Sequence, residues 1–373
     1  MGAVVTQVRV LSTKAVVLTG VALLVIGVGL AIWFVLAYGG HDNQLEAIKT
    51  AGTFVVGGGG AAALYLTARR QRSNEMALQQ KELDQQQADR TYTLQERVAA
   101  ATEAESQQRR ITESYGAALE QLGSDKPAVR LGSLYALERL AQDNPAQRQM
   151  IVNVICAYLR MAPETPSPQE NEVRRTAQRF LGAHLRPAEP GQFWAGIELD
   201  LSEAVLDSFD LRACEVGTAT FHGTEFLGST SFEYCRFTGT AHFDNASFQG
   251  VADFHAAGFA GEASFIDTEF GYTTFRQARF AVVRFTRATF RADVRFSNAE
   301  FTVSAAFNRA VFHQGASLVS AVFADPPDLT RALARGTVDG EWPRGWRTAP
   351  LDETDKVPEG GDPSQWRRLV RQD

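Results

Sequence analysis

The sequence predicts a protein of mixed fold class, with helices in its first half and a four-sided β-helix in its second. Uncharged, mostly apolar residues fill positions 15–38, and a second apolar stretch occupies 51–67. Between 111 and 186 apolar residues recur three or four positions apart, as on one face of a helix. From 201 to 323 a large apolar residue, usually Phe, recurs every five or six positions. These patterns divide the chain into three kinds of structure.

Length and charge narrow the class of protein before any element is assigned. The 373 residues are enough for two or three domains, and the net charge of -6 argues against a protein that coats nucleic acid or anionic lipid through bulk charge. Three cysteines are too few for a disulfide framework, and their odd number fits a reducing compartment.

The first apolar stretch is long enough to cross a membrane. At about 1.5 Å per residue it exceeds the bilayer's hydrocarbon core of about 30 Å, so 15–38 is predicted as a first transmembrane helix. A secretory signal peptide is the alternative, but its apolar core is shorter and no A-x-A cleavage site follows here. Residues 51–67 are shorter and rich in Gly, which permits close helix contact in lipid and predicts a second span.

Flanking charges predict the orientation of the two spans. Basic residues precede the first span and follow the second, whereas the segment between them carries Asp42, Glu46 and only Lys49. Because positive charge stays on the cytoplasmic side, residues 1–14 are expected in the cytoplasm and 39–50 form an external loop. The remainder of the chain is then expected in the cytoplasm.

A long stalk helix is predicted after the second span. Residues 68–109 are rich in Gln, Glu and Ala and contain no Gly or Pro, which favours one continuous helix. Their apolar residues do not hold a heptad, so a single stalk is favoured over a coiled coil.

Residues 110–190 predict a small helical domain. The breaks "GSDKP" and "DNPAQ" separate three amphipathic stretches, with Ser124 or Asp125, and then Asn144, as the expected helix caps. After the Pro-rich "APETPSPQ", residues 170–186 predict a fourth helix. The domain is expected to cover one end of the β-helix, whose open strand edges would otherwise promote aggregation.

The repeat has two regular positions in each unit. A large residue occupies one, and a small side chain such as Ala219 or Thr224 stands two positions before each Phe. The large residues, of which all but five are Phe, stand at 201, 206, 211, 216, 221, 226, 232, 237, 243, 248, 254, 259, 265, 270, 275, 280, 285, 290, 296, 301, 307, 312, 318 and 323.

Four such units close one coil of a square helix. Positions that repeat every five residues cannot form one strand, which alternates every second residue. The large residues then make six coils, stacked about 4.8 Å apart into a rod on the order of 30 Å long. Steps of six residues fall only between the second and third sides or between the fourth and first, as a four-sided coil requires. The core rings are predicted to stack in ladders along the axis, which include Phe221, Phe232, Phe243, Phe254, Phe265, Phe275, Phe285 and Phe296.

This stretch resembles the pentapeptide-repeat family. Units such as "ASFQG" and "AEFTV" match the family's pattern, with Phe in place of Leu and with six-residue steps as departures. The resemblance implies a right-handed quadrilateral β-helix over 196–325 and says little about function. Two spans, a helical "VRLGSLYALERLA" module and then the repeats resemble an arrangement of bacterial pentapeptide-repeat proteins, which implies a bacterial cell membrane with the repeats in the cytoplasm.

Residues 326–373 are expected to close the rod and then to lose regular structure. "DPPDLTRALARGT" predicts a short helix, and Trp342 and Trp346 are placed to cover the last coil. The tail from "APLDETDKVPEGGDPS" onward is predicted to be disordered.

No constellation of catalytic, metal-binding or cofactor-binding residues emerges from the sequence. His222, His255 and His313 each follow a core Phe, but on three different sides of the rod, and no ligand stands beside them at metal-binding spacing. Cys214 and Cys235 share one side on neighbouring coils, within reach of a disulfide, although small core residues in a reducing compartment are the better interpretation. The chain is therefore predicted not to be an enzyme and to need no metal or cofactor.

Charge is distributed unevenly along the repeats. Residues 198–269 carry thirteen acidic groups against two arginines, whereas 276–309 carry seven arginines against two acidic groups. Arginines on a flat β surface can hold phosphate or carboxylate in a bidentate way, although a merely solvated face is the alternative. The candidate interaction surface consists of Arg276, Arg279, Arg284, Arg287, Arg291 and Arg295.

The predicted function is a membrane-tethered, non-enzymatic scaffold that presents the rod to an unknown cytoplasmic protein. One alternative is a DNA mimic, because some pentapeptide-repeat proteins inhibit gyrase with an acidic rod; the anchor and the arginine-rich coils argue against it and against nucleic acid as a partner. A membrane-associated sensor is the other alternative. The glycines of the second span would also allow a homo-oligomer.

Overall fold

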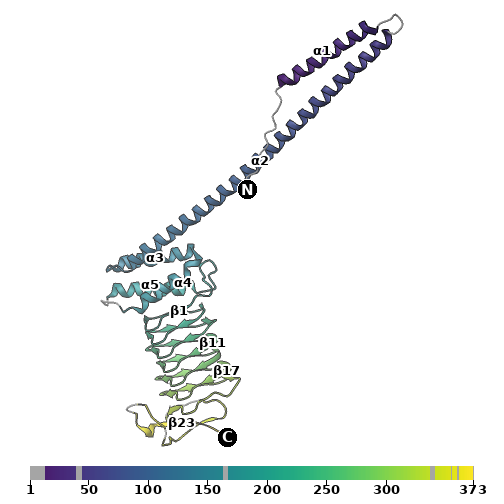
Figure 1. The fold of residues 1–373 in the computed structure, drawn as a ribbon. Helices are drawn as coiled ribbons and strands as arrows, with labels where there is room; N and C mark the ends of the chain where they lie inside the picture. The colour runs from purple at the N-terminus through teal and green to yellow at the C-terminus, as the bar shows by residue number, and fades with distance from the viewer. Residues whose placement is uncertain are drawn as a thin grey trace. The chain divides into compact units, whose positions relative to one another are not determined.

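The computed structural model describes residues 13–38, 44–162, 167–336, 341–353, 355–358 and 361–372. The chain divides into two units, residues 1–106 and residues 107–373. Two helices make up the first unit, and the second contains shorter helices followed by stacked coils of short strands (Figure 1).

One continuous helix replaces three predicted segments. After α1 (Thr13–Tyr38), the helix α2 (Gln44–Leu122) runs for 79 residues through the predicted second span, the stalk and the first helix of the helical domain. It also begins inside the segment predicted as an external loop. Over the part of the chain that the structure describes, no helix is both long and apolar enough to cross a membrane, so the two predicted spans are not confirmed. Residues 1–12 and 39–43 lie outside the described residues.

The helical domain is completed by α3 (Pro127–Asp143), η1 (Pro145–Gln147), α4 (Arg148–Arg160) and α5 (Pro168–His184). Pro127 and Pro145 stand in the first turns, where a missing N–H costs nothing. The predicted caps were wrong in part: Lys126 precedes α3, and Asn144 precedes η1 without a side-chain cap. Ser167 does cap α5, because its hydroxyl accepts a hydrogen bond from the Glu170 N–H at 3.1 Å. The apolar faces meet in a core that includes Leu134, Leu137, Ile151, Ile155, Ala177 and Leu181.

The repeats form a solenoid of parallel, in-register strands grouped in three sheets. The first sheet covers the first and fourth sides of the coils: β1 (Leu199–Asp200), β4 (Ala219–Thr220), β8 (Ala241–His242), β11 (Gly258–Ser264), β14 (Arg279–Arg284), β17 (Glu300–Ala306) and β20 (Val322–Phe323), with β3 (Glu215–Val216) and β7 (Arg236–Phe237) joined through β11.

The other two sheets cover the second and third sides. The second side consists of β2 (Val205–Asp207), β5 (Glu225–Leu227), β9 (Ser247–Phe248), β12 (Glu269–Phe270), β15 (Thr289–Phe290), β18 (Val311–Phe312) and β21 (Leu333–Arg335). The third consists of β6 (Thr230–Ser231), β10 (Ala252–Asp253), β13 (Thr273–Thr274), β16 (Val294–Arg295) and β19 (Ala316–Ser317). Figure 1 shows the coils stacked below the helical domain.

Aromatic rings fill the solenoid between its first and last coils. The predicted core residues are fully buried and form two facing ladders: Phe221, Phe243, Phe265 and Phe285 on the first side, and Phe232, Phe254, Phe275 and Phe296 on the third. Successive rings in a ladder stack, as Phe232 and Phe254 do with centroids 4.8 Å apart. Rings of facing ladders meet edge to face, as Phe243 and Phe254 do at 5.7 Å and 87°. Both geometries suit the quadrupole of an aromatic ring.

The four corners are of two kinds, which explains where six-residue steps occur. After the first and third sides, the small residue donates its N–H to the carbonyl of the ring residue three positions earlier, as Ala246 does to Phe243 at 3.0 Å. The residue just before the small one has a positive φ, 58° at Asn245, as position i+2 of a type II turn requires. This closed turn has no room for an extra residue. The six-residue steps therefore fall at the other two corners, where glycines such as Gly239 and Gly261 stack closely.

The solenoid continues beyond the predicted end at 325. Leu329 and Ala334 take the next two core positions, and Glu341 pairs with Ser317 on the third side. The short helix predicted here is absent from residues 325–336, because Leu329, Ala332 and Ala334 take core positions of a further coil and the chain joins the sheet through β21.

The predicted disordered tail also contains regular structure. β23 (Trp366–Arg371) pairs antiparallel with β21 and with β22 (Trp346–Ala349), following η2 (Pro363–Gln365). Trp342 and Trp346 pack against the core, Trp342 with its ring centroid 5.3 Å from that of Phe312. β23, with β22 beside it, thus covers the free edge of β21, the last strand of the second side.

Candidate functional site

The six arginines predicted as an interaction surface do not share a face. Arg279 and Arg284 lie at the two ends of β14 in the first sheet, and Arg287 and Arg291 flank β15. Arg276 and Arg295 belong to the third side. The structure therefore distributes them around the rod instead of bringing them together.

Most of these arginines are paired with acidic residues of a neighbouring coil. Arg287 is bidentate on Asp267, with Nε at 2.6 Å from Oδ1, and Arg291 reaches Glu269 at 2.7 Å. The pKa of Arg287 is raised, chiefly by its hydrogen bond to Asp267. The other contacts are Arg284 with Glu262 at 3.2 Å, Arg279 with Glu300 at 3.4 Å, and the Arg295 guanidinium over the Tyr272 ring at 5.4 Å. The acidic and basic segments of the sequence thus neutralise each other where they adjoin.

A shallow hollow lies on the fourth side of the rod. It has a volume of about 630 Å³ and runs over β7, β11, β14 and β17. Its floor is low because Gly258, Ala260 and Ala281 have little or no side chain. Arg236 stands on one side of Gly258 and Arg279 on the other, one coil away in each direction. In the described chain the Arg236 guanidinium has no hydrogen bond or ion pair.

The helical domain supplies hydrogen-bond partners to the backbone N–H and C=O groups at the open edge of the first coil. On the first side, the Gln149 amide donates to the Glu198 carbonyl at 2.9 Å and accepts from the Glu198 N–H at 2.9 Å. On the fourth side, the Glu215 N–H donates to the Leu185 carbonyl at 2.7 Å. On the second, Arg174 donates to the Val205 carbonyl at 3.3 Å.

The third side and the corners are held by charged groups. The Arg186 Nε donates to the Arg212 carbonyl at 3.0 Å. Three arginines of the helical domain pair with carboxylates of the first coil: Arg160 with Asp200 at 2.6 Å, Arg175 with Asp207 at 2.7 Å and Arg186 with Asp210 at 3.7 Å. The hydrogen bond from Arg175 is the main reason why the pKa of Asp207 is lowered.

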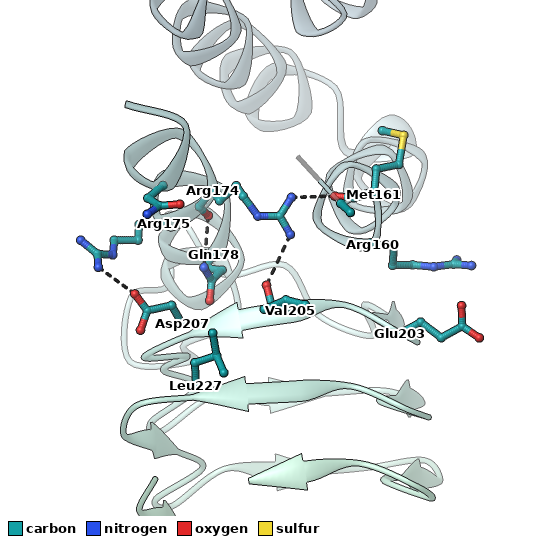
Figure 2. Close-up of a pocket in the computed structure, with 11 residues that line it drawn as sticks. Arg160, Met161, Arg174, Arg175, Gln178, Glu203, Val205, Asp207 and Leu227 are labelled. Atoms are coloured by element: carbon teal, nitrogen blue, oxygen red, sulfur yellow. Dashed lines mark hydrogen bonds and ion pairs between the residues drawn. The ribbon is translucent and has the colours of Figure 1, made fainter. Parts of the chain in front are cut away.

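Two adjoining clefts open along α5 where it meets the first coil. One has a volume of about 250 Å³ and lies between the end of α4, α5 and β2 (Figure 2). The other, of about 460 Å³, continues along α5, and both are lined by Arg175, Gln178 and Asp207. We call the two together the junction groove. Its two buried polar residues are Arg174, 8% exposed, and Gln178, 7% exposed.

A buried ionic cluster holds α3, α4 and α5 together behind the groove. Glu170, 5% exposed, forms an ion pair with Arg130 and accepts a hydrogen bond from the Tyr158 hydroxyl at 2.6 Å. Burial is the largest cause that raises the pKa of Tyr158, followed by its hydrogen bond to Glu170, so the hydroxyl remains a donor. The cluster positions α5, and with it the residues that line the groove.

His184 is a packed residue of the helical domain. Its ring stacks on Trp194 with centroids 4.0 Å apart, and Nε2 lies 2.8 Å from Glu138 Oε1. Groups of three or more metal-ligating side chains are absent from the described residues.

The three cysteines are all buried and free. The disulfide that Cys214 and Cys235 could have formed is not present. Burial raises the pKa of Cys156 and of Cys214 to about 12.

The architecture is a four-sided β-solenoid carried on a helical domain. Its short parallel strands, five-residue repeat units and stacked Phe ladders define a repeat protein rather than a globular domain with a central cavity. A family model described as Pentapeptide repeats (9 copies) matches residues 212–258 and 243–289. The chain is thus a pentapeptide-repeat protein. A search of curated proteins found no match to the sequence.

Sequence reasoning missed the residues of the helix–rod junction. Gln149, Arg174 and Gln178 carry no motif, and their partners lie far away in sequence. One feature of the sequence did indicate this contact. Helices rich in arginine precede a first coil rich in aspartate, and opposite charges on adjoining domains predict contact.

Proposed function

We propose that this chain is a non-enzymatic scaffold that binds a protein partner in the hollow on the fourth side of its rod. The observation that supports the proposal is the hollow itself, formed where Gly258 interrupts a column of longer side chains. A rigid rod suits this role, because its surface needs no ordering when a partner binds.

The chemistry of the hollow favours an acidic, extended segment of the partner. Arg236 has no acidic partner within the described chain, and Arg279 has only an exposed contact with Glu300. Tyr234, 58% exposed, stands at the rim and offers an apolar ring with a polar tip. A carboxylate between the two guanidiniums and an apolar group beside Tyr234 would match these features.

The proposal includes a membrane tether at the N-terminus in a bacterial cell, with the rod in the cytoplasm. It is supported by the uncharged apolar residues of 15–38, the Gly-rich 51–67 and the basic residues that flank them. A protein that presents a docking surface has no need of a catalytic group, a metal or a cofactor.

A DNA mimic is less well supported than a protein scaffold. The carboxylates of the first coil that such a mimic would expose are occupied, since Asp200, Asp207 and Asp210 pair with arginines of the chain itself. Nucleic acid is not expected to bind.

The test fills the hollow without disturbing the fold. A Cβ added at Gly258 meets nothing within 4 Å, so Gly258→Gln should fold normally and occlude the floor. Val251→Gln, on another side and 41% exposed in the native protein, is the matched control. Partners captured by the full-length protein and by the control, lost with Gly258→Gln and lost again with Arg236→Glu, would support the proposal. Equal capture by all four proteins would refute it.

A further inference from the structure

The junction groove is lined by five arginines and three carboxylates: Arg160, Arg174, Arg175, Arg179 and Arg186 with Glu203, Asp207 and Asp210. Four of the arginines are paired with a carboxylate: Arg160 with Asp200, Arg175 with Asp207, Arg179 with Glu172 and Arg186 with Asp210. The charge that remains to be balanced in the groove is that of Arg174.

Arg174 is the deepest of these cations, and its charge is not compensated by direct contact. Its guanidinium donates only to main-chain carbonyls, among them Met161 at 2.8 Å and Val205 at 3.3 Å, as Figure 2 shows. Within the described residues, no carboxylate lies at ion-pair distance from it. Burial lowers the pKa of Arg174, which reflects the cost of holding this charge away from water. An anion in the groove would offset that cost.

Gln178 adds a requirement for a hydrogen-bond donor. The side chain lines both clefts, and its amide nitrogen donates to the Arg174 carbonyl at 3.4 Å. Its amide oxygen is buried and has no partner. Figure 2 shows this oxygen directed away from the Arg174 carbonyl, toward the coils. A buried acceptor without a donor is unfavourable, so a ligand that supplies a hydroxyl would be stabilised here.

We propose that the junction groove binds inorganic phosphate in its monohydrogen form. This anion meets both requirements, because its negative charge would offset that of Arg174 while its one P–OH donates to Gln178 Oε1. Sulfate has the same shape and charge but no proton to donate. The groove should therefore distinguish the two anions by the single hydrogen bond to Gln178.

The experiment measures binding of sodium phosphate and sodium sulfate to the purified full chain by titration calorimetry, at about pH 8 and equal ionic strength. The native protein should bind phosphate at least about tenfold more tightly than sulfate. Gln178→Met, which keeps the size of the side chain and removes the acceptor, should bring the two affinities together. Gln249→Met, the same change at an exposed position of the rod, should leave the phosphate preference intact.

Three results would overturn the proposal. Equal affinity of the native protein for the two anions would mean that the arginines attract anions without a specific site. Absence of phosphate binding, or an unchanged preference in Gln178→Met, would exclude the assigned contact. If Gln178→Met failed to fold by circular dichroism, the comparison of phosphate with sulfate on the native protein would still decide. None of these outcomes bears on the hollow of the fourth side, so the two proposals fail independently.

Discussion

The Gln149 side chain occupies the place that a neighbouring strand would take against Glu198. Its amide nitrogen and oxygen lie 2.9 Å from the Glu198 carbonyl oxygen and N–H, respectively. A primary amide has the same donor and acceptor as a peptide group, so one side chain closes the edge of the first side. An uncovered edge is the feature through which stacked strands recruit other chains. The helical domain is thus the N-terminal cap of the solenoid.

Removal of this amide should loosen the cap. Gln149→Met loses both hydrogen bonds to Glu198, and an exposed one to Asn153, while it keeps the length of the side chain. The free energy of unfolding should fall by about 1–2 kcal/mol, since each net hydrogen bond contributes about 1 kcal/mol. Gln121→Met, on the exposed face of α2, is the control and should change little. Urea denaturation of the two variants measures the difference. An unchanged midpoint for Gln149→Met would mean that water replaces the amide without loss.

Two glutamates two residues apart should differ widely in their effect on stability. Glu170 is buried and pairs with the partly buried Arg130, whereas Glu172 forms an exposed pair with Arg179. Glu170→Ala leaves the Arg130 guanidinium without its counter-charge, and breaking a buried pair typically costs about 3–5 kcal/mol. Glu172→Ala should cost less than about 1 kcal/mol, as exposed pairs do. Thermal unfolding of both variants would show whether the cluster stabilises the domain; similar melting temperatures would contradict it.

The buried thiols should be unreactive in the folded protein and should weaken it at high pH. Burial raises the pKa of Cys156 and Cys214 to about 12 from an ordinary value of 9.0. A raised thiol pKa gives stability that is complete below pH 9.0 and is lost as the pH rises toward 12, because the unfolded chain releases these protons first. Labelling with a thiol reagent should therefore be slow until denaturant is added. Cys214→Ala should reduce the loss of stability above pH 9.0, and an identical pH profile would refute this account.

Some features of this fold could be derived from the sequence and others could not. The spacing of Phe residues indicated the square coil and the positions of its longer corners, because a core position repeats with every side. The last, incomplete coil was missed because Leu329 and Ala334 replace the expected Phe. The pairing of Arg287 with Asp267 was missed because the two are 20 residues apart, which is one coil along the rod. Writing the sequence coil by coil would have revealed it.

Because of the ion pairs between coils, reversing the charge of these arginines should lower the stability of the rod. Arg284, Arg287 and Arg291 face Glu262, Asp267 and Glu269, so their joint replacement by Glu sets three pairs of like charges together. The free energy of unfolding should fall by about 2–3 kcal/mol at low salt, since three exposed pairs of up to about 1 kcal/mol each are lost and replaced by repulsion. The effect should shrink in concentrated salt, which screens exposed charges.

The control variant makes the same change in net charge at three other arginines of the rod. Arg236, Arg276 and Arg309 have no ion pair in the described part of the chain, and their joint replacement by Glu should leave stability nearly unchanged. Denaturation in urea, which is uncharged, at low and at high sodium chloride concentration would compare the free energies of unfolding of the two triple variants. If both lost the same stability, net charge rather than the pairs would be responsible.

The stacked corner glycines should be the least tolerant positions of the rod. A Cβ at Gly261 would stand 2.5 Å from the carbonyl oxygen of Gly239 on the preceding coil, and backbone cannot yield as a side chain can. Gly261→Ala should therefore destabilise the rod by about 1–3 kcal/mol, the usual cost of forcing extra atoms into a packed site. Gly258→Ala in the same strand, where the new Cβ meets nothing within 4 Å, should be neutral or slightly stabilising because the unfolded chain loses freedom. The two variants differ from the native protein by the same methyl group, so their melting temperatures isolate the contact between coils. A neutral Gly261→Ala would show that the corners can separate. A destabilised Gly258→Ala would show that the fourth side has no free space, and it would remove the basis for filling its hollow with Gly258→Gln.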